Sequence, residues 1–157
     1  MSSMQKEVRP KILGGITVKV TTGCGNMYVQ LNWKNGRLFE VFATLGKSGG
    51  CASCQIEALT RSITLGLRCG ILPEEYIDQL RAIRCPSPLP FPRESAVSSC
   101  PDAISKTLEQ YGNLAIEDVV KTICGVNPSE VISVEEEEKR AKEAVAQLAK
   151  IREEQDL

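Results

Sequence analysis

Residues 27–45 read MYVQLNWKNGRLFEVFATL and decide the fold of this chain. The stretch contains two β-prone runs, residues 27–33 and residues 38–45. Asn35-Gly36 lies between them, and Asn-Gly is a preferred centre of the type I′ turn that joins antiparallel strands. The sequence therefore predicts a β-hairpin here.

The neighbouring segments extend this hairpin into an α+β fold. Residues 12–22 alternate apolar and polar side chains, which predicts a further strand and so a three-stranded antiparallel meander. After the glycine-rich break at residues 46–50, apolar side chains recur at helical spacing, which predicts a long helix over about 51–69 that stops at Gly70. The apolar side chains that define this helix are Ile56, Leu59, Ile63 and Leu67.

Shorter helices are predicted beyond this core, with a proline-rich loop at residues 85–93. The expected helices are 73–80, 101–111 and 116–124. From Glu135 onward the chain is rich in Glu, Lys, Arg, Ala and Gln, with a thin apolar stripe at helical spacing. That stripe consists of Ala141, Val145, Leu148 and Ile151. We expect a domain over 12–133 and a charged C-terminal helical tail over 134–157.

Overall charge and composition exclude several classes of function. The 19 Lys and Arg residues nearly balance the 20 Asp and Glu residues, so no strong field attracts nucleic acid or an anionic membrane. No apolar run approaches the roughly 20 residues of a spanning helix, and the charged N-terminus lacks the apolar region of a signal peptide. We therefore expect a cytoplasmic protein without membrane association.

The cysteines carry the main chemical signal. The chain has seven cysteines and no histidine, and an odd number in a reducing compartment fits metal ligation or thiol chemistry better than disulfides. Four of the seven lie at turns or helix starts, where backbone N–H groups and the helix dipole stabilise thiolates. These four are Cys24, Cys51, Cys85 and Cys100, with Cys100 expected at the N-cap of its helix. Because their spacing is not that of a zinc ribbon, the fold must bring them together.

The remaining cysteines and the other motifs leave alternatives open. Cys54, Cys69 and Cys124 lie in or at the ends of predicted helices, where packing explains them. Cys51 and Cys54 also form a C-x-x-C at a helix start, which is the local chemistry of a thiol–disulfide exchange site.

Two further interpretations rest on basic residues. Gly46-Lys47-Ser48 suggests a phosphate loop, but Val41 stands where the first glycine of that motif is required. Lys34, Arg37 and Lys47 suggest a weak nucleic-acid-binding surface. The alternative, that these residues only form a solvated basic face, is favoured.

Several blocks in order resemble the TSCPD domain family. They are Thr22–Val29, Glu40–Lys47, Gly49–Cys51, Ile83–Pro86 and Ser99–Ile104, within a match over about residues 14–112. Ser99 replaces the threonine of the naming motif. The family is commonly fused near the C-terminus of adenosylcobalamin-dependent ribonucleotide reductases and also occurs as small free-standing proteins, and its recurring cysteines fall on the four chosen above. No reductase barrel, cobalamin site or redox tail is recognisable, so the chain is not expected to reduce nucleotides.

Together these observations predict a non-catalytic zinc-binding accessory or regulatory module with four thiolate ligands. The resemblance implies an association with ribonucleotide reductase and deoxyribonucleotide synthesis. The charged C-terminal helix is expected to dock on this domain, on a second copy or on a protein partner.

Overall fold

The computed structural model of the chain describes residues 5–46, 50–91 and 96–125. The chain divides into two compact units, Met1–Val119 and Val120–Leu157. The first unit contains the sheet and the helices that pack on it. The predicted tail lies outside the described residues.

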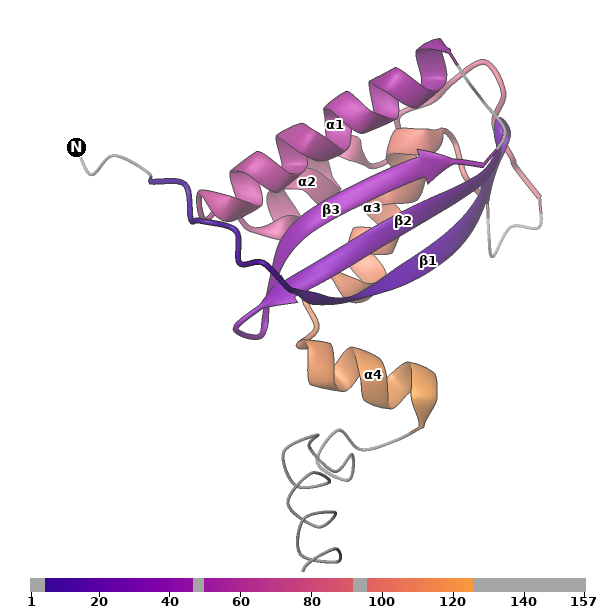
Figure 1. Cartoon of the computed structure of the whole chain (residues 1–157). Helices are drawn as coiled ribbons and strands as arrows, with labels where there is room; N and C mark the ends of the chain where they lie inside the picture. Colours follow the sequence, from indigo (N-terminus) through magenta and orange to yellow (C-terminus); the bar gives the residue numbers. More distant parts are fainter. Residues whose placement is uncertain (1–4, 47–49, 92–95, 126–157) are drawn as a thin grey trace, which may run out of the picture. The chain divides into compact units, whose positions relative to one another are not determined.

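Three consecutive strands form one antiparallel sheet in the order β1-β2-β3 (Figure 1). They are β1 (Gly14–Thr22), β2 (Gly25–Lys34) and β3 (Arg37–Leu45). Asn35 and Gly36, between β2 and β3, have φ angles of 53° and 74°. Both values lie in the left-handed region that a type I′ turn requires, which confirms the predicted hairpin.

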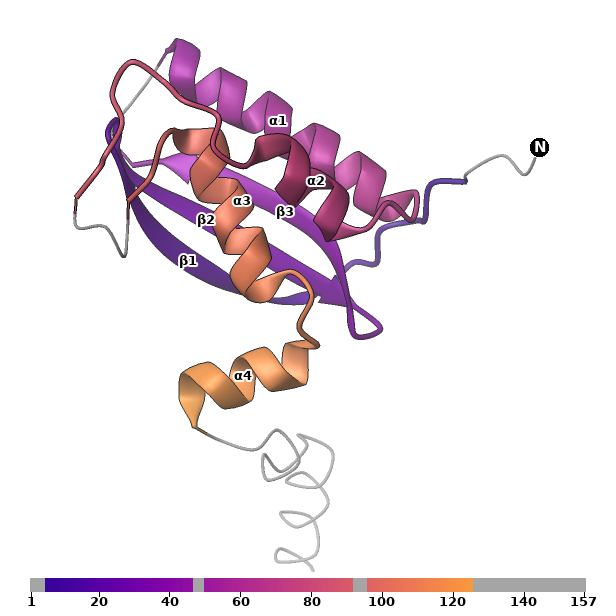
Figure 2. The same ribbon diagram turned by 180° about the vertical axis from the view of Figure 1, so that it is seen from behind.

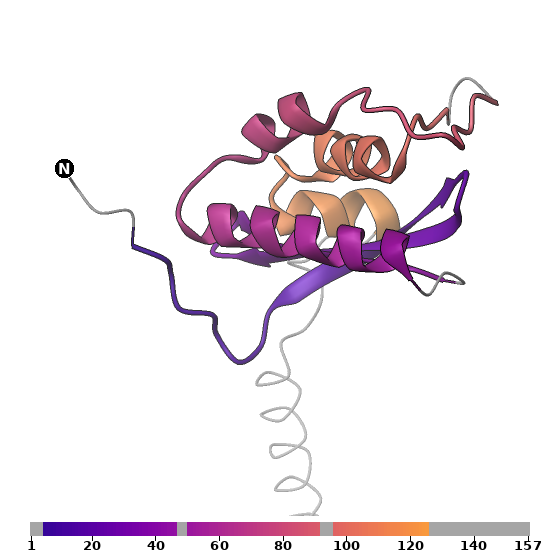
Figure 3. The same ribbon diagram turned by 90° about the horizontal axis from the view of Figure 1, so that it is seen from above.

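The helices also confirm their predicted positions within two residues. They are α1 (Cys51–Arg68), α2 (Pro73–Leu80), α3 (Cys100–Tyr111) and α4 (Ile116–Cys124). Helices α1, α2 and α3 lie on the same side of the sheet (Figure 2), and α2 and α3 lie side by side (Figure 3). The described chain is thus an α+β fold with a sheet layer and a helical layer.

The core lies between the sheet and this helical layer. Alternate side chains of β2 point into it, and Met27, Val29 and Leu31 are fully buried. From the helices, the fully or almost fully buried apolar residues include Ile63, Leu67, Ile104 and Leu108. The period-2 pattern of β2 and the helical pattern of α1 therefore meet in a single apolar cluster.

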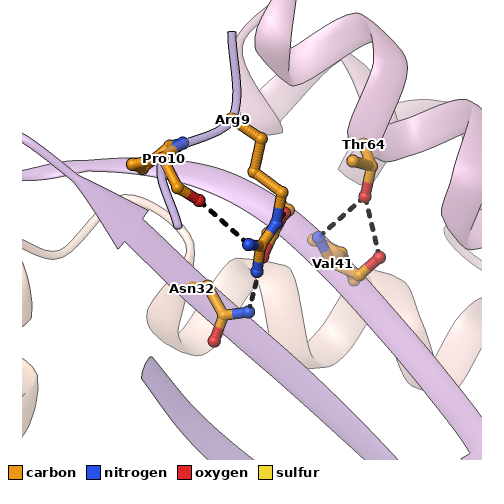
Figure 4. Close-up of polar contacts among 6 residues, drawn as sticks. Arg9, Pro10, Asn32, Val41 and Thr64 are labelled. Carbon is orange, nitrogen blue, oxygen red and sulfur yellow. Dashed lines mark hydrogen bonds and ion pairs between the residues drawn. The ribbon is translucent and has the colours of Figure 1, made fainter. Parts of the chain in front are cut away.

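A buried carboxylate anchors the segment that precedes β1, where Arg9 lies beside Asn32 of β2 (Figure 4). The Glu40 side chain is only 1% exposed, and its two oxygens accept hydrogen bonds from the Arg9 guanidinium at 2.8 and 2.9 Å. The Asn32 amide donates a further bond to Glu40 at 2.9 Å. Because a buried charge is costly unless it is paired, this cluster fixes Arg9 to the outer face of the sheet.

The outer edge of β3 is closed by α1. The Thr64 hydroxyl donates to the Val41 carbonyl oxygen at 2.8 Å and accepts from the Val41 backbone N–H at 2.9 Å (Figure 4). A single side chain thus satisfies both outward-facing backbone groups of Val41, which a strand edge otherwise exposes.

One local expectation needs correction. Cys100 is the first residue of α3 rather than its N-cap, because Ser99 takes the cap and its hydroxyl accepts from the Asp102 N–H at 3.2 Å. In the proline-rich loop, the described residues form no helix or named strand, and an isolated antiparallel bridge joins Leu89 to Val97.

Candidate metal centre

Three of the four predicted ligands line one cavity of about 400 Å³. They are Cys24, Cys85 and Cys100. They come from the β1–β2 turn, the proline-rich loop and the start of α3, and the turn is far from the other two segments in sequence. The fold therefore brings together thiols that their spacing alone could not pair.

Cys24 lies in the two-residue turn between β1 and β2, which Thr22 organises. The Thr22 hydroxyl donates to the Gly25 carbonyl oxygen at 2.8 Å and accepts from the Cys24 N–H at 3.3 Å. A Cβ added to Gly23 would lie 1.7 Å from the carbonyl oxygen of Ser87. The turn thus packs directly on the proline-rich loop, and only glycine permits this approach.

Cys100 lies in the first turn of α3 and is buried. Its sulfur is 3.8 Å from the Thr22 hydroxyl oxygen, a contact that joins α3 to the β1–β2 turn. Thr22 opens the Thr-Gly-Cys-Gly turn and contacts both cysteine segments, a role that the sequence pattern alone does not indicate.

Cys85 is half-buried at the base of the proline-rich loop. Its N–H donates to the Ser98 carbonyl oxygen at 3.1 Å, which closes the loop on itself. The loop is fixed to α3 by Asp102, whose carboxylate oxygens accept from the N–H groups of Ala82 and Ser98, each at 2.9 Å. Asp102 thereby positions Cys85 next to Cys100.

The packing around the Cys100 thiol and the Asp102 carboxyl shifts the pKa of each group. Burial raises the pKa of the Cys100 thiol above its ordinary value of 9.0, and the neighbouring Cys24 and Cys85 raise it further against an opposing contact with Thr22. For Asp102, burial opposes ionisation, yet the two backbone hydrogen bonds and the charge of Lys106 prevail and lower its pKa. Burial thus favours the neutral form of the Cys100 thiol, whereas the hydrogen bonds and the Lys106 charge around Asp102 favour its carboxylate form.

The rest of the cavity wall is largely apolar. It is formed by Ala52, Gln55, Ile56, Leu59, Leu80, Ile83 and Pro101. Apolar surroundings of this kind suit soft thiolate ligation.

Cys51, the fourth predicted ligand, does not line the cavity. It is the first residue of α1 and is exposed, while the next residue, Ala52, contributes to the cavity wall. In the part of the chain that the structure describes, no group of three Cys, Asp or Glu side chains is arranged to hold a metal ion. The donor set itself, three thiols on one cavity with a fourth thiol one residue beyond its wall, has the chemistry of a thiophilic site.

The other two candidate sites are the Cys51–Cys54 pair and the basic residues considered for nucleic-acid binding. Cys54 lies one turn into α1 and is exposed like Cys51, and its sulfur is 3.1 Å from the Cys51 carbonyl oxygen. Lys34 and Arg37 both bind the Glu7 carboxylate, and the bond from Lys34 is the leading cause of the lowered pKa of Glu7. Lys47 lies outside the described residues. Two of the three basic residues proposed for nucleic acid are therefore already paired within the chain.

Fold and cavity together define a small α+β domain built around a cluster of cysteines. The model of the TSCPD domain family matches residues 3–112, and the chain belongs to that family. The match includes all four predicted ligands. No curated protein and no solved structure matches the chain. Within the described ranges, no helix combines the length and apolar content needed to cross a bilayer.

Proposed function

We propose that this chain is a non-catalytic accessory module that binds one zinc ion and serves a ribonucleotide reductase, or another enzyme of nucleotide metabolism, in trans. The proposed ligands are Cys24, Cys51, Cys85 and Cys100. The observation that supports the proposal most directly is the shared cavity, where three separate segments of the chain each contribute one thiol.

Zinc is the metal that this donor set fits best. The chain contains no histidine, so a tightly held transition metal depends on thiolates, and four thiolates complete the tetrahedral shell that structural zinc prefers. When bound, zinc supplies a cross-link rather than a reaction site, because a filled shell has no position for a substrate. The surrounding residues hold the loop, turn and helix in place, and Asp102 and Thr22 provide the connecting hydrogen bonds.

The partner proposal rests on family membership. Because TSCPD domains are commonly fused to such reductases, a chain that carries the domain is expected to act together with one. The charged tail, residues 134–157, is the proposed region for docking on that partner or on a second copy. Direct binding to purified adenosylcobalamin-dependent ribonucleotide reductase from the same host, measured by calorimetry, tests this part.

Metal analysis with cysteine variants tests the zinc site. The protein purified without added zinc is expected to carry one zinc per chain, and serine at any of the four ligand positions should lower zinc affinity by more than roughly 100-fold, since even supporting residues around a metal cost 10–100-fold. Cys69→Ser is the matched control, because Cys69 is half-buried at the end of α1 and away from the cavity. A colourless protein without zinc, or equal losses in the ligand and control variants, contradicts the proposal.

A second candidate function is thiol–disulfide exchange by Cys51 and Cys54. Both thiols are exposed at the start of α1, three residues apart, which is the access that this chemistry needs. Oxidation of the pair would pass two electrons and two protons to a disulfide substrate and leave a Cys51–Cys54 disulfide. The Cys54→Ser variant separates the two functions. If Cys51 is a metal ligand, the variant should still bind zinc. If Cys51 and Cys54 are a redox pair, the variant should no longer reduce a disulfide substrate.

A further inference from the structure

The outer edge of β1 is unpaired in the part of the chain that the structure describes. β1 pairs with β2 on one side, and among the described residues no strand lies along its other side (Figure 1). The opposite edge of the sheet differs, because Thr64 of α1 occupies both backbone groups of Val41 in β3. An unprotected strand of nine residues is an unusually long template for pairing with another chain.

A hydrogen bond between β2 and the residue after β3 shows which backbone groups of β1 face β2 and which face the open edge. The Gly46 N–H donates to the Asn26 carbonyl oxygen at 2.9 Å, so Asn26 directs its backbone groups at β3. Because this direction alternates in antiparallel strands, the next residues to face β1 are Met27, Val29 and Leu31. Their partners in register are Val20, Val18 and Ile16. The β1 backbone groups left facing the open edge belong to Gly15, Thr17, Lys19 and Thr21.

The apolar layer is also incomplete at this edge. Ile16, Val18 and Val20 point to the core side of β1 but remain only half-buried. Their partners Val29 and Leu31 on β2 are fully buried. The core therefore ends at β1 with apolar side chains that a further strand would cover.

We propose that two copies of this chain pair through β1, antiparallel and about a twofold axis at Val18, to form a continuous six-stranded sheet. With this centre, all nine residues of β1 overlap with β1 of the second copy. Thr17 then lies opposite Lys19 of the second copy, and Ile16 lies opposite Val20. Outward-facing backbone groups meet outward-facing groups, and apolar side chains meet apolar side chains on the core side.

The charge on β1 selects this register over its neighbour. A centre at Lys19 would place the two lysines opposite each other, which opposes pairing. A shift by a single residue between the strands would bring outward-facing backbone groups against groups already bonded to β2. A centre at Thr17 also avoids this contact but overlaps only residues 14–20, so the register centred at Val18 gives the longest pairing without opposed lysines. This self-complementarity favours a second copy over an unrelated strand and gives a closed twofold pair.

The mass of the full-length protein in solution tests the pairing. Sedimentation or light scattering is expected to give twice the 17.2 kDa of one chain. Thr17→Pro should give a monomer, because proline removes an N–H that faces the open edge and is not needed for pairing with β2. Thr17→Lys should raise the dimer dissociation constant roughly tenfold, since it creates two like-charge contacts. The Thr17→Lys/Lys19→Glu double variant should restore the dimer, because each contact then joins opposite charges.

Gln30→Lys is the matched control. Gln30 is exposed on β2 directly beside Thr17, so the substitution adds the same charge to the same sheet face but away from the edge. Circular dichroism establishes that each variant is folded. A monomeric wild type overturns the proposal. So does a dimer that persists in both Thr17→Pro and Thr17→Lys, because the contact then lies elsewhere, as in the charged tail.

Discussion

Asp102 shows how much a single buried side chain can organise in this domain. Its carboxylate is 2% exposed and accepts two backbone hydrogen bonds at 2.9 Å from the segment that carries Cys85, while its own N–H binds the Ser99 cap of α3. Lys106, one turn along α3, adds an ion pair at 3.1 Å. One residue thus fixes both the helix that carries Cys100 and the loop that carries Cys85.

The lowered pKa of Asp102 predicts a dependence of stability on pH. Because the folded-state pKa lies below its ordinary value of 3.8, the stabilisation is complete above that value and is lost as pH falls through the lowered pKa. Asp102→Asn should cost about 1–3 kcal/mol at neutral pH, since the amide NH₂ of asparagine would face backbone N–H groups that need an acceptor.

Denaturant unfolding from pH 7 to pH 2 measures this effect. The difference between wild type and Asp102→Asn should shrink as the pH falls below about 4, because protonation removes the wild-type advantage. Asp78→Asn, at an exposed position of α2, is the matched carboxylate-to-amide control. A constant difference across the whole range would mean that the Asp102 charge plays no part.

At the scale of elements, most of the fold could be predicted from local patterns. The Asn35-Gly36 turn fixed the β2–β3 hairpin because its left-handed φ angles suit few other residue pairs. Periodicity placed α1, since its buried face follows directly from helical geometry. These features depend on residues close in sequence, where spacing alone is informative.

The site could be predicted only in part, because its connections are long-range. Turn chemistry identified Cys24, Cys85 and Cys100, and the structure places all three on one cavity. The same sequence reasoning did not identify Asp102 or Thr22, because these residues act through hydrogen bonds to segments distant in sequence. Nor could the sequence show that Cys51 lies outside the cavity wall. A helix start predicts the local backbone environment of a thiol, but it does not predict which residues from other segments lie beside it.

The contact between the β1–β2 turn and the proline-rich loop yields a prediction for Gly23. This glycine does not have a positive φ, so alanine fits its backbone, and the cost arises from the Cβ position 1.7 Å from the Ser87 oxygen. Gly23→Ala should therefore destabilise the protein by about 1–3 kcal/mol and lower zinc affinity by moving Cys24 away from the loop.

Thermal unfolding and zinc titration of the same samples test this prediction. Gly14→Ala is the control, because a Cβ there meets no atom within 4 Å. If Gly23→Ala and Gly14→Ala behave alike in both measurements, the turn and the loop do not depend on close packing.

At the scale of the whole molecule, two different kinds of connection hold the first unit together. Apolar packing joins the sheet to α1 and α3 over most of its length. Near the cysteines, hydrogen bonds from Thr22 and Asp102 add to that packing, because the cavity is lined both by core residues such as Ile56 and Leu80 and by the three thiols. The proposed metal would add a further cross-link between the turn, the loop and α3 at this end of the core.

The tail provides the last prediction, which rests on sequence alone because residues 134–157 lie outside the described part of the chain. Its apolar stripe has the spacing of one helical face, and an isolated helix of this length is marginal in water. The acidic run at residues 135–138 favours the helix N-terminus, whereas Glu153, Glu154 and Asp156 oppose the dipole at the other end. Packing of the stripe on a folded surface is therefore needed to stabilise it.

Truncation after Ser133 should lower the thermal stability of the domain, change its oligomeric state or weaken its binding to the proposed partner, depending on which surface the tail covers. A full-length variant with glutamine at Val145, Leu148 and Ile151 keeps the length and charge of the tail and removes most of its apolar stripe, so it should reproduce the effect of truncation if packing is the cause. If truncation has an effect that the glutamine variant lacks, charge rather than packing mediates docking. If oligomeric state, thermal stability and partner binding all remain unchanged after truncation, the tail does not dock, because a helix face that buries apolar surface must contribute to at least one of these three measurements.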